Sequence, residues 1–370
     1  MHLWFINRLF WFYILMSKRY FLYPFLPLYK FGVWVRNKLF DLKVLKSESF
    51  DIPVISIGNI CAGGSGKTPH SEYFIRMLKE NYNVALLSRG YKRKSKGFIL
   101  ADNNSTASLI GDEPFQIKQK FKDITVAVDA DRCNGIKNIL ERKPDTNLII
   151  LDDAFQHRYV TPKVSVLLFD YNNMFYNDTL LPVGNLREPA NARFRANIII
   201  VTKCPEDIRP IDKRILIKRV ALFPYQKLFF SCFTYSNHIA VFENNDIKEL
   251  KIEHFGKNYN ILALSGIANP KPFDDYLIST GANIKSLHFK DHHNFSKKDI
   301  GNIVEQFYSI SHRNRSKSYI ITTEKDAARI LNMNIPDDIK THIYALPLRV
   351  KIIDNEDNIL ESCIFNMIKQ

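Results

Sequence analysis

The sequence predicts an α/β fold in which helices cover both faces of a parallel sheet. Short apolar runs without polar alternation, such as 147–151 and 165–169, are typical of strands that are buried on both faces. These runs alternate with segments of helical periodicity, and alternating strands and helices favour a parallel sheet. The 370 residues are enough for about two domains with cores of their own.

The first half of the chain contains most of the alternating pattern. A strand is expected at Pro53–Ile57, a helix at about Pro69–Glu80 and a second strand at Asn83–Ser88. Helices are then expected at 114–122 and 132–143, and strands at 124–128, 147–151 and 165–169.

A stretch rich in Pro, Gly, Asn and Arg, Leu181–Pro189, interrupts this pattern and is interpreted as a joint between domains. We therefore expect a sheet domain at 47–190 and a smaller α/β domain at 191–370 that closes a cleft over the first. The strands expected in the second domain are 197–202, 260–264, 318–323 and 342–346.

The first 46 residues form a segment with a composition of its own. They hold eight Lys/Arg and one acid, so they supply half of the net charge of +14, and they are dense in aromatic residues. The longest uncharged stretches have nine and ten residues, whereas a membrane span needs about 20. We therefore expect a helix at the membrane surface. A helix packed on the protein's own core and a basic nucleic-acid arm are the alternatives, but no nucleic-acid motif accompanies the charge.

The cysteines predict no disulfide framework. All five are scattered along the chain, with no pair at metal or redox spacing. This usage favours a reducing compartment.

A glycine-rich loop at Gly58–Pro69 follows the first expected strand and leads into a helix. Strand, glycine loop, Lys-Thr and helix is the order found in P-loop nucleotide sites, where glycines let backbone N–H groups reach phosphate oxygens. Lys67 would contact the β- and γ-phosphates, and the Thr68 hydroxyl would ligate Mg²⁺. The expected phosphate contacts are Gly63, Gly64, Ser65, Gly66, Lys67 and Thr68.

The loop departs from two common patterns. Cys61 stands where the usual spacing has Gly, and Ala62 stands where a deviant class has a signature Lys. A turn without a ligand is the alternative interpretation. A membrane-localised P-loop ATPase that switches a protein partner is the alternative function, although Ala62 argues against it.

Acidic residues supply candidates for metal binding and proton transfer. Asp152 and Asp153 end a buried strand, where a phosphate-loop enzyme places its Mg²⁺-organising acid. Asp112 and Glu113 begin a helical pattern, and Asp112 is a candidate general base for an attacking hydroxyl. Helix capping is the alternative role at both places.

Two further groups are compatible with a site. His292, in Asp291–Phe295, could reach across an interdomain cleft to orient an acid or polarise a substrate. The basic run Ser88–Lys94 and Arg132 could meet an anionic substrate or the γ-phosphate. A solvated loop is the alternative for each.

Taken together, the motifs resemble those of the tetraacyldisaccharide 4′-kinase (lipid A 4′-kinase) family. The ordered set spans about residues 53 to 327. Its members are Gly58–Pro69, Leu87–Tyr91, Gly111–Pro114, Asp131-Arg132, Leu151–Arg158, Leu181–Pro189, Asp291–His293 and Thr323–Ala327. Ala154 and Asn185 depart from the Gly and Pro expected in these motifs.

The resemblance implies transfer of the ATP γ-phosphate to the 4′-hydroxyl of a tetraacylated glucosamine disaccharide 1-phosphate, giving lipid IVA. It implies a peripheral enzyme at the cytoplasmic face of the bacterial inner membrane, with a glycolipid substrate, ATP and Mg²⁺. The residue roles that carry over are Lys67 and Thr68 as phosphate and Mg²⁺ contacts, Asp112 as base, His292 as its partner, Asp152 and Asp153 as the Mg²⁺ acids, and Glu113 and Arg132 as further site residues.

Overall fold

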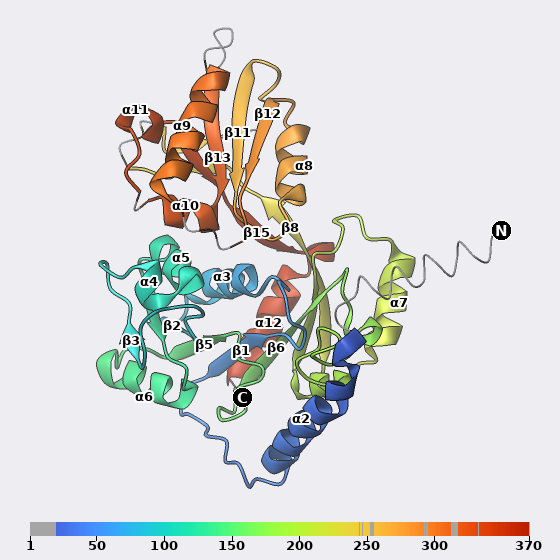
Figure 1. Ribbon diagram of the computed structural model, residues 1–370. Coiled ribbons are helices and arrows are strands. Elements are labelled where there is room, and N and C mark those ends of the chain that lie inside the picture. Colours follow the sequence, from blue (N-terminus) through green and yellow to red (C-terminus); the bar gives the residue numbers. More distant parts are fainter. Residues whose placement is uncertain are drawn as a thin grey trace, which may run out of the picture.

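The computed structural model describes residues 20–243, 245, 247–251, 255–291, 293, 295–311, 317–331 and 333–369. The described chain forms two units stacked on each other, each built on its own sheet (Figure 1). The first sheet has the strand order β15-β8-β7-β6-β1-β5-β2-β4-β3. Its strands are β1 (Val54–Gly58), β2 (Val84–Ser88), β3 (Ile99–Leu100), β4 (Thr125–Val128), β5 (Leu148–Asp152), β6 (Val164–Asp170), β7 (Ile198–Thr202), β8 (Lys227–Tyr235) and β15 (Leu348–Ile352).

Most neighbours in this sheet run parallel. The strands from β8 to β4 in the sheet order pair in parallel, whereas β15 and β3 are antiparallel edges. Every residue of β1, β2, β5 and β7 is buried, as the apolar runs predicted. The carboxyl ends of the parallel strands lie at one edge of the sheet, so the loops that leave them gather there.

Helices pack on both faces of the first sheet. Apolar side chains of α3 (Lys67–Leu78), α5 (Asp112–Lys120) and α12 (Asp357–Lys369) join the core on one face. On the other face α6 (Arg132–Arg142) and α7 (Pro210–Val220) cover separate parts of the sheet. This confirms the predicted α/β fold with a large, mainly parallel sheet. The shorter helices are α4 (Ala107–Ile110), η2 (Phe175–Asn177), η3 (Ala190–Arg195) and η4 (Ile353–Asn355).

The second unit is a smaller α/β layer structure. Its sheet order is β10-β9-β14-β13-β11-β12, with parallel pairing from β14 to β12. Helices α9 and α11 share a core on one face, and α8 packs into the core of the other. The bounds are β9 (His238–Ala240), β10 (Glu249–Leu250), β11 (Tyr259–Ser265), α8 (Lys271–Ser279), β12 (Asn283–His288), α9 (Lys297–Ser311), β13 (Lys317–Thr323), α10 (Glu324–Ile330), α11 (Asp337–Lys340) and β14 (Ile343–Leu346).

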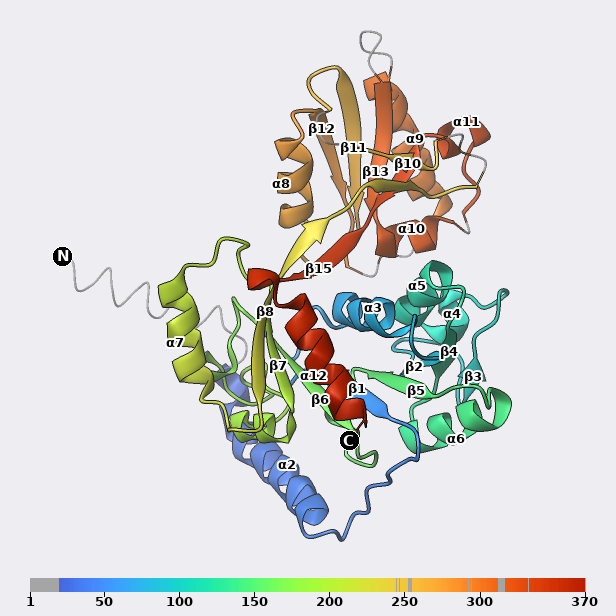
Figure 2. The ribbon, with the colours of Figure 1, turned by 180° about the vertical axis from the view of Figure 1, so that it is seen from behind.

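The chain crosses between the units at two points, after β8 and before β15, and α12 then packs on one face of the first sheet (Figure 2). The first sheet therefore continues well past residue 190, where the joint between domains was expected. The physical reason is long-range pairing: β15 joins β8 with Val350 opposite Phe233. The segment Leu181–Pro189 lies instead beside the glycine loop, with Ala62 N–H donating to Asn185 O at 2.6 Å.

The N-terminal end of the described chain is an η1–α2 arm, η1 (Tyr20–Phe25) followed by α2 (Leu26–Asp41). Within the part of the chain that the structure describes, no helix is long and apolar enough to cross a membrane. The inner side of α2 is fixed by bonds from Tyr29 Oη to Arg187 O (3.0 Å) and from Arg36 to Gln156 O (2.8 Å). Its outer side leaves large apolar side chains exposed, among them Leu28, Phe31 and Trp34. Residues 1–19 of the expected membrane segment lie outside the described residues.

Candidate active site

The glycine loop leaves the carboxyl end of β1 and ends where α3 begins at Lys67. Gly63 and Gly66 have φ angles of +118° and +80°, a region that side-chain-bearing residues rarely adopt. A Cβ at Gly63 or Gly64 would meet nothing within 4 Å, so the space beside the loop is open. The first turn of α3 leaves N–H groups without intrahelical partners, and this end of the helix carries partial positive charge. The loop thus has the shape and charge to take an anion such as phosphate.

Buried hydrogen bonds on the protein side of the glycine loop hold its backbone in place. Ser65 Oγ accepts from the Asn59 amide at 2.8 Å, and Ser65 O accepts from the Thr202 hydroxyl at 2.9 Å. His70 is fully buried, with Nδ1 2.8 Å from Gly66 O and Nε2 2.9 Å from Ser231 Oγ. Burial lowers the pKa of His70 to about 4, so the imidazole is neutral at neutral pH. A neutral ring can donate from Nδ1 to Gly66 and accept at Nε2 from Ser231.

The two predicted acids lie next to the loop but differ in environment. Asp152 ends β5, is buried, and accepts a bond from Ser71 Oγ of α3 at 2.9 Å. Asp153 has a φ of +47°, and its carboxylate lies 3.7 Å from Lys67 Nζ and 3.3 Å from Arg187 Nη1. The structure therefore brings Lys67, Asp152 and Asp153 together, as the sequence predicted.

The electrostatics of Asp152 suit a bound cation. Burial, and then the neighbouring charge of Asp153, raise the pKa of Asp152 to about 6, and Glu113 also raises this pKa. Lys67 and the Ser71 hydroxyl lower it. A hard divalent ion such as Mg²⁺ prefers carboxylate and hydroxyl oxygens and would relieve this repulsion. Asp152, Asp153 and the Thr68 hydroxyl at the start of α3 are a fitting donor set.

Arg132 is a buried structural cation behind the acids. It begins α6 and donates from Nη1 to Asp129 O at 2.6 Å and from Nη2 to Asp152 O at 3.3 Å. Burial lowers the pKa of its guanidinium to about 10, although Asp152 and Asp153 oppose this shift. Arg132 thus holds the backbone of the Asp152 turn and places a positive charge behind the acids.

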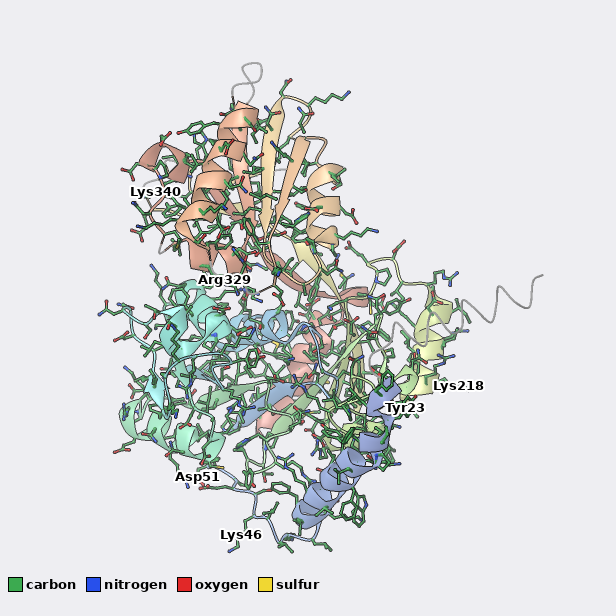
Figure 3. All side chains as sticks on the ribbon, in the orientation of Figure 1. Tyr23, Lys46, Asp51, Lys218, Arg329 and Lys340 are labelled. Atoms are coloured by element: carbon green, nitrogen blue, oxygen red, sulfur yellow. The ribbon has the colours of Figure 1, made fainter. Side chains whose placement is uncertain are left out.

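Asp112 and Glu113 form the first turn of α5, which begins two residues before the expected helix start at residue 114, and they lie at the boundary between the two units. The Asp112 carboxylate accepts a 2.5 Å bond from Arg329 Nη2 of α10 in the second unit. Arg329 Nη1 also donates to the buried Asp326 at 3.2 Å, and Asp326 accepts from Gly266 N–H at 2.8 Å. Arg329 lies at the base of the second unit, over α5 (Figure 3).

His292 lies outside the described residues. The adjacent Asp291 forms an ion pair with Lys325 of α10 at 3.1 Å, one helical turn before Arg329. On the other side, His293 Nε2 lies 3.0 Å from Asp299 Oδ2. The residues that flank His292 are therefore held at the same end of the second unit as α10, which contacts α5.

A second group of possible metal ligands lies near Arg132. Asp131, Cys133 and His157 place one ligand atom each within 4.8 Å of one another. However, Asp131 Oδ1 already caps α6 by accepting from Cys133 N–H and Asn134 N–H. Burial raises the pKa of the Cys133 thiol to about 11, which disfavours the thiolate that metals bind. We therefore assign this group to the capping of α6.

Sequence reasoning missed three residues that the fold brings to this region: Arg187, Arg329 and His70. Arg187 lies in the segment interpreted as a joint, and only its position inside the Leu181–Pro189 motif could have pointed to it. Arg329 lies 217 positions after Asp112, beyond any local pattern. His70 lies one helical turn after Gly66, and at this spacing a helical side chain can reach back to the backbone of the loop.

A glycine loop at the start of a helix, the buried Asp152 and half-buried Asp153 beside it, and the Asp112 carboxylate at the boundary with the second unit define a phosphoryl-transfer enzyme on an α/β fold. The comparisons with known proteins agree. The family model for LpxK, tetraacyldisaccharide-1-P 4′-kinase, matches residues 18–368. The chain belongs to this family.

Named relatives are similar over nearly their full length. A tetraacyldisaccharide 4′-kinase of Phocaeicola vulgatus is 47% identical, covering 94% of this chain and 95% of that protein. One of Bacteroides fragilis is 49% identical, covering 94% and 93%. The crystal structure of LpxK from Aquifex aeolicus in complex with ATP is similar with a TM-score of 0.73 and 28% identity, covering 95% of this chain and 99% of that chain.

Proposed function

We propose that this kinase transfers the γ-phosphate of ATP to the 4′-hydroxyl of a tetraacylated glucosamine disaccharide 1-phosphate, giving lipid IVA. The relatives' names supply the reaction. The observation that carries the proposal is the contact of Lys67, at the end of the glycine loop, with Asp153: the two lie 3.7 Å apart, next to the buried Asp152 at the end of β5. A candidate phosphate cradle thus lies beside candidate Mg²⁺ acids, and Asp112, the candidate base, lies in the first turn of α5 at the boundary with the second unit.

The glycine loop and Lys67 would bind the ATP phosphates. Backbone N–H groups of residues 63–68 and the Lys67 ammonium neutralise phosphate charge, which is most of what phosphoryl transfer requires. Thr68, Asp152 and Asp153 would hold Mg²⁺, which supplies charge neutralisation at the phosphate oxygens when bound. Lys67 is 3.7 Å from Asp153, so ATP competes with Asp153 for this ammonium.

Asp112 is assigned the proton transfer. The acceptor's 4′-hydroxyl loses its proton to the Asp112 carboxylate as its oxygen attacks the γ-phosphorus. The bond between the γ-phosphorus and the β,γ-bridging oxygen breaks, and ADP leaves with that electron pair. Arg329 holds the Asp112 carboxylate, and His292 is assigned the role of its partner. Closure of the second unit over α5 would exclude water and limit hydrolysis of ATP.

The acceptor is a membrane glycolipid, so the enzyme has to work at a bilayer surface. We assign the η1–α2 arm, with its exposed Phe21, Phe31 and Trp34, to peripheral contact at the cytoplasmic face of the inner membrane. Aromatic and basic side chains on a non-spanning helix favour the bilayer interface.

The proposal is tested by incubating the purified chain with ATP, Mg²⁺ and a monophosphorylated tetraacyl disaccharide in mixed micelles. Mass analysis should find one added phosphate, at the 4′ position. With ATP labelled at the γ-phosphate, label should appear in the lipid. Label that appears only as free phosphate would contradict the proposal and favour a switch-type ATPase.

A further inference from the structure

The surface helix α7 has an outer face of unusual composition. Its buried residues, Leu216 and Val220, pack into the core that also receives Leu26 and Tyr29 of α2. At 100° per residue, the outer face is left with two isoleucines flanked by basic residues. These outward residues are Ile211, Arg214, Ile215, Lys218 and Arg219, all exposed.

Both isoleucines of this face are largely exposed to solvent. Ile211 is 55% exposed and Ile215 is 44% exposed. The turn that follows α7 adds two exposed aromatic side chains, Phe223 and Tyr225, whose rings stack at 5.8 Å. Exposed apolar side chains of this size that gather at one surface are typical of a site that binds a protein or a membrane.

The basic residues of this face are available to an anionic partner. In the described part of the chain, no carboxylate lies within ion-pair distance of Arg214 or Lys218. By contrast, Arg209 is paired with Asp212 at 2.7 Å, and Lys213 with Asp354 at 2.5 Å. Arg219 reaches over the Tyr176 ring and keeps its charge exposed. Asp212 and Asp354 thus neutralise Arg209 and Lys213, whereas the basic residues of the outer face keep their charge.

This face lies on the same side of the molecule as the η1–α2 arm (Figure 1 and Figure 3). Both helices pack into one core cluster, which fixes α7 and α2 to the same part of the first unit. Lys218 and Tyr23 lie on the same side of the molecule (Figure 3), away from the second unit. A flat, anionic partner with an apolar interior could contact both at once.

We propose that the α7 surface, defined as the outer face of α7 with Phe223 and Tyr225, is a second membrane-contacting surface that lies on anionic phospholipid headgroups beside the η1–α2 arm. Apolar side chains framed by Lys and Arg are typical of helices that lie in the bilayer interface. Two contacts separated on one rigid body would fix the tilt of the enzyme, whereas a single helix would let it swivel. The inference rests on the proposed peripheral location, which it deepens.

The experiment measures partition of the full chain onto vesicles of phosphatidylcholine with phosphatidylglycerol by flotation. A charge variant, Arg214→Glu with Lys218→Glu, should partition about tenfold more weakly than the wild type, and the difference should shrink at high salt. An apolar variant, Ile211→Ser with Ile215→Ser, should also lose about tenfold. The matched control carries Lys297→Glu, Lys298→Glu and Ile278→Ser, exposed residues of α8 and α9, and should float like the wild type.

The outcomes of the flotation experiment distinguish failure of the α7 surface from failure of the proposed peripheral location. Kinase activity in mixed micelles should be unchanged in the α7 variants, which shows that they fold. If the wild type floats and the α7 variants float equally well, the inference is overturned while the proposed peripheral location stands. If the wild type does not float, the peripheral location fails and the inference fails with it. If the wild type is a dimer in lipid-free solution and the α7 variants are monomers, the face binds a second copy and the lipid assignment is wrong.

Discussion

Arg329 of the second unit holds the Asp112 carboxylate of the first through a bond of 2.5 Å between Nη2 and Oδ2. The same guanidinium reaches the buried Asp326, so it is fixed at its other end. The candidate base is therefore oriented by a residue from across the boundary between the units. Approach of the second unit and positioning of Asp112 are linked through this one side chain.

Replacing Arg329 should impair turnover without removing the base itself. We expect Arg329→Met to lower kcat by about 10- to 100-fold with KM for ATP nearly unchanged, because Asp112 loses its orientation while the glycine loop stays intact. Arg329→Lys keeps the charge but not the two-armed contact and should recover part of the activity. Steady-state kinetics in mixed micelles measures this. A rise in KM for ATP that exceeds the fall in kcat would contradict a role of Arg329 in positioning Asp112.

Replacing Asp112 should have a larger effect on the chemical step. We expect Asp112→Ala to lower kcat by about 10²- to 10⁴-fold, the usual contribution of a general base, with ATP binding largely retained. Binding of ATP is measured separately by calorimetry. Lys67→Ala is the matched comparison, because loss of the phosphate contact should weaken ATP binding itself. Full turnover in Asp112→Ala would exclude Asp112 as the base.

The sequence predicted those parts of the site that local chemistry determines. The glycine loop, Lys67 and the Asp152–Asp153 pair follow from strand ends and residue types, and the structure brings them together at one sheet edge. The contacts of Arg329 and Arg187 depend on how distant segments meet, which no local pattern encodes. The extent of the first sheet was missed for the same reason, since β15 pairs with β8 more than 100 residues earlier in the chain.

Asp152 should make the stability of the ligand-free protein depend on pH. Its pKa is raised from 3.8 to about 6 in the folded state, so the folded state binds this proton more tightly than the unfolded state. The resulting stabilisation is full below about pH 4 and is lost as the pH rises through 6. Asp152→Asn should therefore be more stable than the wild type at pH 8, by on the order of 2 kcal/mol, and less so at pH 5.

Thermal melts at the two pH values measure this difference. Mg²⁺ with ATP should reverse the order at pH 8, because a bound cation stabilises the ionised carboxylate that the variant lacks. If the melting temperatures of the variant and the wild type differ equally at pH 5 and pH 8, another group controls this pH dependence.

His70 should support the glycine loop, and its effect on the loop can be separated from its effect on stability. His70→Ala leaves Gly66 O without its side-chain partner and opens a cavity, so we expect KM for ATP to rise several-fold and stability to fall by about 1–3 kcal/mol. Ser231→Ala removes only the Nε2 contact and should reduce stability while KM stays within about twofold. Equal KM values in the two variants would mean that His70 does not position the loop.

Lys120 of α5 joins the two units through a buried ionic cluster. Its ammonium lies 2.5 Å from Glu72 of α3 and 2.6 Å from Glu324 of α10. Burial and the charge of Glu72 raise the pKa of Glu324. Without Lys120 the two carboxylates would face each other across the boundary. Glu72 would keep Arg76 at 2.8 Å, whereas Glu324 would keep only Arg349, which lies about 4 Å from both carboxylates, among the ion pairs of the described residues.

We expect Lys120→Met to destabilise the protein by about 3 kcal/mol, because the buried carboxylate of Glu324 loses its closest cation and keeps its desolvation cost. It should also lower kcat, since repulsion between α3 and α10 moves Arg329 away from Asp112. Adding Glu324→Gln removes the repulsion, so the double variant should regain much of both losses. Denaturant melts and kinetics of the wild type, Lys120→Met, Glu324→Gln and the double variant form a double-mutant cycle. Additive losses would show that Lys120 and Glu324 act independently, and the cluster would then not couple the units.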